Sequence, residues 1–93
     1  MVKEEKTGEE IQDSILHYLW QQNAWGERYK NFTDMVKRVS SVVINNGKNT
    51  RKQVKILIKN GLVLIKKQGR TISLDPHYKT TIRDRLIEAD YHI

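Results

Sequence analysis

The chain has 93 residues, 38% of them hydrophobic and 30% charged, which suits one globular domain and is too short for two. It has no cysteine, which excludes disulfide bonds and thiolate chemistry, and no apolar run approaches the roughly 18 residues of a membrane span. The first ten residues lack the apolar stretch of a secretory signal, so we expect a cytoplasmic protein.

The net charge of +6 is concentrated in the middle of the chain. Residues 1–27 carry two basic and six acidic side chains. Residues 28–70 carry twelve basic side chains and one acidic side chain, and residues 71–93 carry three basic and four acidic side chains. The middle segment therefore has a net charge of +11, and it repels itself unless it meets a polyanion. Nucleic acid is the expected partner. An anionic membrane surface and a merely lysine-rich surface are the alternatives.

A capped helix is predicted near the start of the chain, after a flexible tail over residues 1–8. Thr7 and Glu10 have the spacing of a capping box, in which each side chain binds the other residue's backbone amide. Apolar residues then recur at helical spacing as far as Leu19, which predicts a helix over residues 8–22.

A second helix is predicted in the basic segment, after a loop over residues 23–31. Asn31 or Thr33 can cap its first turn, and its apolar stripe continues to about Val43.

A third helix is predicted after Asn45-Asn46-Gly47, which favours a turn. Asn49 or Thr50 would cap this helix, and Asn60-Gly61 would end it, because glycine readily adopts the left-handed conformation found after helices.

After Gly61 the pattern changes from helical to strand-like. Residues 62–65 are rich in β-branched side chains, residues 66–69 are polar, and residues 70–74 alternate, which predicts a β-hairpin with a basic tip. Asp75-Pro76 would open a fourth helix over residues 77–90. Residues 9–93 are thus predicted to form a single mainly α domain with a small β-hairpin (α+β). The order helix, helix, helix, hairpin, helix is that of a winged helix-turn-helix.

The third predicted helix is amphipathic. Thr50, Val54, Leu57 and Ile58 fall on one side, which we expect to face the core, and lysines dominate the other side. The major groove of DNA admits such a helix, and there Arg bonds guanine while Asn and Gln bond adenine. The predicted base contacts are Asn49, Arg51, Lys52 and Gln53. Lys55 and Lys59, with Lys48 just before them, are predicted to bind phosphates. A solvated basic face is the alternative.

The tip of the predicted hairpin adds a second basic group. Its members are Lys66, Lys67, Gln68 and Arg70, which we expect to touch phosphates or the minor groove. An edge made lysine-rich to block sheet aggregation is the alternative. Arg28, Lys30 and Thr33 lie before or at the start of the second helix, where free amides can bind phosphate.

The stretch from Asn49 to Val63, a basic helix followed by Asn60-Gly61-Leu62-Val63, resembles the recognition helix of the winged helix-turn-helix superfamily and its transition into the wing. Residues 70–76 resemble the second wing strand and the step into the last helix. Size and the terminal helix are similar to PadR-like and small archaeal, plasmid and viral members. Length and lysine- and isoleucine-rich character are similar to a centromere-binding protein of an archaeal plasmid partition system.

This resemblance, which covers about residues 9–89, implies site-specific binding to double-stranded DNA. One form of it is plasmid segregation, with spreading along DNA and a partner protein of the partition apparatus. Transcription regulation, as a repressor, is the other.

A homodimer is expected, because one small copy would leave apolar faces of its first and fourth helices uncovered, and two-fold dimers match palindromic DNA sites. The predicted dimer residues are Ile11, Ile15, Tyr18, Tyr78, Ile82 and Leu86. A fourth helix folded back on its own core is the alternative.

The sequence has no phosphate-binding glycine loop, metal-ligand spacing, catalytic triad or plausible carboxylate pair. We therefore expect neither an enzyme nor a cofactor or metal.

Overall fold

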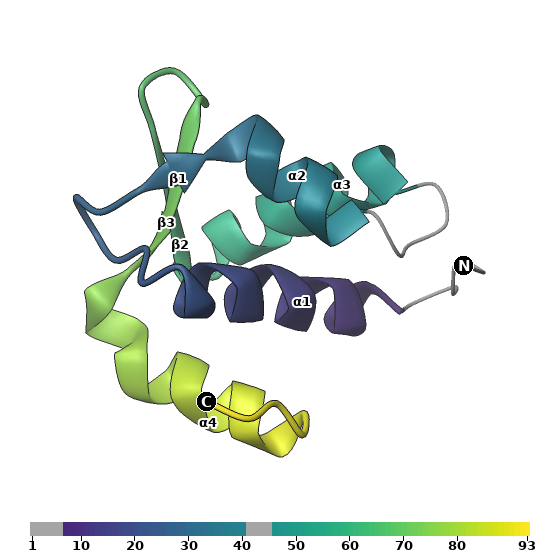
Figure 1. The fold of residues 1–93 in the computed structure, drawn as a ribbon, viewed down its shortest axis with the longest axis vertical. Helices are drawn as coiled ribbons and strands as arrows, with labels where there is room; N and C mark the ends of the chain where they lie inside the picture. The colour runs from purple at the N-terminus through teal and green to yellow at the C-terminus, as the bar shows by residue number, and fades with distance from the viewer. Residues whose placement is uncertain (1–6, 41–45) are drawn as a thin grey trace.

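Three helices pack side by side, and a small sheet lies against one end of them (Figure 1). The computed structural model describes residues 7–40 and 46–93. The helices are α1 (Gly8–Gln21), α2 (Phe32–Ser40) and α3 (Asn46–Lys59). Strands β1 (Lys30–Asn31), β2 (Val63–Lys66) and β3 (Thr71–Leu74) form an antiparallel sheet in the order β1-β3-β2. A 3-10 turn, η1 (Pro76–Tyr78), leads into α4 (Lys79–Glu88), which lies on the side of α1 opposite to α2. The predicted α+β class is confirmed, and the order of elements agrees except for the unpredicted strand β1, which makes the sheet three-stranded.

The core lies between the three helices and the inner face of the sheet. Its fully buried side chains come from every layer and include Ile15, Leu16 and Leu19 of α1, Met35 of α2, Leu57 of α3, and Ile72 and Leu74 of β3. Each such side chain contributes about 1.5–3 kcal/mol when it leaves water. Leu57 therefore fixes which side of α3 faces inward.

The local capping signals are confirmed where the structure describes them. The Thr7 hydroxyl accepts from the Glu10 amide at 3.2 Å, and the Glu10 carboxylate accepts from the Thr7 amide at 3.1 Å. Gly8 is the first residue of α1, so the predicted tail does not extend to Thr7 and Gly8. The Asn31 side chain accepts from the Asp34 amide at 3.0 Å, which makes Asn31, and not Thr33, the cap of α2.

Gly61 ends α3 as predicted. Its backbone has a φ of +80°, and the Leu62 and Gly61 amides turn back to the carbonyls of Leu57 and Ile58, at 3.1 and 3.0 Å. These bonds satisfy carbonyls that the end of a helix leaves free. The chain then enters β2.

Two predicted boundaries are wrong. The loop predicted over residues 23–31 contains β1, a third strand in which Lys30 pairs with Ile72 and Asn31 with Thr71. Helix α3 begins at Asn46, so Asn49 and Thr50 are interior residues and not caps. The buried Thr50 hydroxyl is 2.8 Å from that of Ser40, which is a tertiary contact between α2 and α3. Val43 and Asn45 lie outside the described residues.

The predicted dimer interface is also wrong at most of its positions. Ile11, Ile15, Ile82 and Leu86 are fully buried inside one copy, because α4 folds back onto α1. Tyr18 is half-buried against the same core, and Tyr78 is exposed beside Gly61. The apolar stripe of α4 is thus covered within one chain, which removes the reason to expect pairing through it.

Candidate nucleic-acid interface

A single row of lysines runs along the outer side of α3, facing away from Leu57. Lys48, Lys52, Lys55 and Lys59 are spaced four, three and four positions apart, which places them in one line on a helix. All four are exposed, and none has a carboxylate partner among the described residues. Each adjacent pair repels by about 0.2–0.5 kcal/mol. Since α3 begins at Asn46, Lys48 belongs to the helix and lengthens this row, here called the lysine row.

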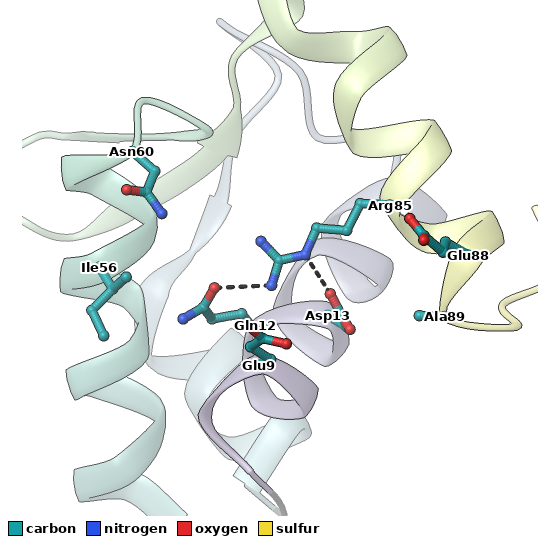
Figure 2. A pocket seen from close by; sticks show the side chains of 8 residues that line it. All are labelled: Glu9, Gln12, Asp13, Ile56, Asn60, Arg85, Glu88 and Ala89. Carbon is teal, nitrogen blue, oxygen red and sulfur yellow. Dashed lines mark hydrogen bonds and ion pairs between the residues drawn. The ribbon is translucent and has the colours of Figure 1, made fainter.

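Two buried polar contacts hold α3 in the orientation that exposes the lysine row. One is the contact between Thr50 and Ser40. In the other, the Gln12 side-chain amide of α1 donates to the Gln53 carbonyl oxygen at 2.8 Å. Gln12 in turn accepts from Arg85 of α4 at 2.9 Å, and Arg85 also donates to Asp13 at 2.6 Å (Figure 2). Buried polar groups need these partners, so the pairing fixes the rotation of α3 against α1.

The hairpin of β2 and β3, here called the wing, stands beside α3. Lys55 and Ile58 of α3 line a common pocket with Ile65 and Gly69 of the wing, so the two elements form one continuous surface. Arg51 lies at the edge of the same pocket. The predicted recognition helix and the predicted wing are therefore adjacent in the fold.

Two cations at the tip of the wing are held by neighbouring side chains. The Lys66 ammonium donates to the Glu27 carboxylate at 2.7 Å, and this hydrogen bond and the lysine charge lower the pKa of Glu27. The Lys67 ammonium donates to the Tyr29 hydroxyl and lies 4.3 Å from the centre of its ring. These contacts direct both side chains along the β1 side of the wing.

The wing turn contains three successive residues in the left-handed region. Lys67, Gln68 and Gly69 have φ values of 52°, 58° and 85°, and the Arg70 amide closes the turn on the Lys67 carbonyl at 3.2 Å. A residue with a Cβ atom pays about 1–2 kcal/mol in this conformation, whereas glycine does not. Lys67 and Gln68 are thus strained.

Replacing Gln68 with glycine is expected to raise the free energy of unfolding by about 0.5–1 kcal/mol, because relief of the strain exceeds the entropy that glycine adds to the unfolded chain. Urea denaturation measures it. Arg70→Gly is the matched control in the same exposed turn, since Arg70 has no positive φ. Its free energy of unfolding is expected to fall, and equal losses in both variants would contradict the strain at Gln68.

Most predicted contact residues lie on this combined surface or its margins. The exposed ones are Lys48, Arg51, Lys52, Lys55 and Lys59 on α3, Lys66, Lys67, Gln68 and Arg70 on the wing, and Arg28 and Thr33 near α2. Asn49 and Lys30 are half-buried. Gln53 corrects the prediction: it is 9% exposed and bonded to Gln12, so it faces α1 and cannot reach a base edge.

Sequence reasoning placed Ile58 in the core, but the side chain is 42% exposed and lines the pocket beside the wing. It also missed Glu27 and Tyr29, which lie in the predicted loop and hold the wing lysines. Trp20 and Trp25 pack edge to face with ring centres 5.4 Å apart and lie against the core, as expected of packing residues.

Comparisons of the chain with family models, with curated proteins and with solved structures find no match. Within residues 7–40 and 46–93, no helix is both long and apolar enough to cross a membrane. The same residues contain no group of three or more histidine and acidic side chains placed to hold a metal ion. The site is therefore characterised by its charge and shape.

Proposed function

We propose that this chain is a site-specific double-stranded DNA-binding protein and not an enzyme. Helix α3 lies in the major groove with the lysine row toward the duplex, and the wing lies along the adjacent backbone. Arg51 and Lys52, with Asn49 beside them, are the candidates for base contacts, and Lys48, Lys55 and Lys59 bind phosphates. On the wing, Lys67 and Arg70 are the leading phosphate contacts, since Lys66 is paired with Glu27.

The observation that carries the proposal is the lysine row, which has no carboxylate partner within residues 7–40 and 46–93. Four like charges along one helix oppose its formation, and Lys48 in the first turn also faces the positive end of the helix dipole. A solvated surface would balance this row with acidic residues, but the only acidic residue from 28 to 70 is Asp34 of α2. A polyanion removes the repulsion.

Binding to a fluorescent 24-base-pair duplex, measured by anisotropy from 50 to 300 mM salt, tests the proposal. Five phosphate contacts predict a slope of about −4.5 in a plot of log affinity against log salt, because each contact releases condensed counterions. A control with polyglutamate-coated beads checks for plain charge attraction. Polyglutamate is also anionic, so only tighter binding to the duplex than to polyglutamate supports the proposal. A flat salt response, or equal affinity for the duplex and for polyglutamate, contradicts it.

A segregation factor and a transcription repressor would both use this interface. They differ in their neighbouring genes and in how far binding extends along the DNA. A neighbouring gene for a partition ATPase and binding that spreads along DNA support a segregation factor. A single protected site over a divergent promoter supports a repressor. Footprinting with increasing protein distinguishes these outcomes, since spreading extends the protected region and a repressor does not.

A further inference from the structure

Ile58 is an exposed apolar side chain on a helix whose outer side is otherwise cationic. It is 42% exposed and sits one turn from Lys55 and next to Lys59. Ile56, at 37% exposed, lies on the opposite flank of α3, where it lines the pocket between α3, α1 and α4 (Figure 2). The two isoleucines therefore face different surroundings.

Ile58 forms one wall of a small apolar notch between α3 and the wing. The notch has a volume of about 280 Å³, and the side chains of Phe32, Val54, Ile58 and Ile65 line it together with Gly69 and parts of Arg51 and Lys55. Val54 is buried, whereas Phe32 and Ile65 are only partly covered. An apolar surface is thus bordered by two cations.

This combination selects a ligand that is anionic and also presents an apolar group. DNA has phosphates for Lys55 and base-edge acceptors for Arg51, and in the major groove the one apolar group on its base edges is the thymine C5-methyl. Burying a methyl against isoleucine is favourable, whereas an exposed isoleucine facing only polar base edges gains nothing.

We propose that the Ile58 notch binds the C5-methyl group of a thymine, so that the cognate site contains a thymine opposite this end of α3. This inference rests on the proposed DNA binding and adds a sequence preference to it. The methyl packs against Ile58 while Lys55 binds the flanking backbone and Arg51 reaches a neighbouring base edge.

The test compares duplexes that differ only in that methyl group. Duplexes enriched from a random library for binding are synthesised with thymine or with 2′-deoxyuridine at each thymine position, and their affinities are measured by anisotropy. Removing the methyl is expected to weaken binding about three- to fivefold for each contacted thymine. Equal affinity for both duplexes, with the steep salt dependence retained, overturns the notch and leaves the proposed function standing.

Two matched variants locate the effect. Ile58→Gln keeps a helix-forming residue of similar size and is expected to bind both duplexes equally, at the level of the wild-type chain on deoxyuridine. Ile56→Gln makes the same change on the other flank and is expected to keep the preference for thymine. A preference that survives in Ile58→Gln overturns the assignment. Failure of the wild-type chain to bind any duplex overturns the proposed function itself.

Discussion

Replacing Lys48 and Lys55, two predicted phosphate contacts, together with glutamine is expected to weaken binding to duplex DNA about 30-fold at 0.15 M salt. Each lost phosphate contact flattens the slope of log affinity against log salt by about 0.9, so two contacts flatten it by about 1.8. At 0.15 M salt this corresponds to about 1.5 powers of ten in affinity. Anisotropy titrations across salt measure both quantities.

The matched control removes two positive charges elsewhere. Lys79 and Arg83 are exposed on α4, away from the lysine row, and Lys79→Gln with Arg83→Gln changes the net charge equally. We expect this pair to keep the wild-type slope. If both pairs weaken binding to the same extent, the net charge and not the lysine row attracts DNA, and the proposed orientation of α3 is wrong.

The same variant has a second readout that separates binding from folding. Glutamine at positions 48 and 55 removes the repulsion within the lysine row, so the free energy of unfolding is expected to stay level or rise slightly. A protein that binds less and is no less stable has lost contacts to DNA. A marked loss of stability would show instead that these lysines support the fold.

The start of α1 and the end of α3 were predictable from sequence because their chemistry is local. Thr7 and Glu10 cap α1 through atoms three residues apart, and Gly61 ends α3 through its own backbone conformation. Such signals depend on neighbours in the chain and on no distant partner. The order of elements followed from them and from the change of hydrophobic period after Gly61.

The buried sides of α3 were only partly predictable, because helical periodicity gives the direction of the core and not its width. Gln53 is buried because Gln12, 41 residues away, supplies its partner. Ile58 is exposed because nothing in the described chain covers the notch beside the wing. Both depend on contacts that no local pattern encodes.

The pairing of strand β1 and the position of α4 on α1 also depend on contacts between residues far apart in the sequence. Two residues, Lys30 and Asn31, are too few to show alternation, and they are extended because β3 offers them a free edge. The apolar stripe of α4 was visible in the sequence, but whether α1 of the same copy or of a second copy covers it depends on the path taken after Pro76. The 3-10 turn there directs α4 back onto α1.

Arg85→Ala is expected to lower the free energy of unfolding by about 2–3 kcal/mol, since it leaves the Asp13 carboxylate and the Gln12 carbonyl without their donor. The side chains of Arg85 and Asp13 are 27% and 15% exposed, so residual water keeps the loss below that of a fully buried pair. Figure 2 shows Arg85 reaching from α4 to both partners on α1. Urea denaturation measures the change.

Arg83→Ala is the control on the same helix, because in the described part of the chain Arg83 pairs with its exposed neighbour Asp84, at 3.2 Å. Its cost is expected to stay below about 1 kcal/mol. The double variant Asp13→Ala with Arg85→Ala should cost less than the sum of the single variants, since each removes the other's need for a partner. Strict additivity would mean that the pair contributes no coupling. The hydrogen bonds link Arg85 to α3 through Gln12, which bonds Gln53, and not to the lysine row, so the Arg85 variant, while folded, should keep the full salt slope for DNA.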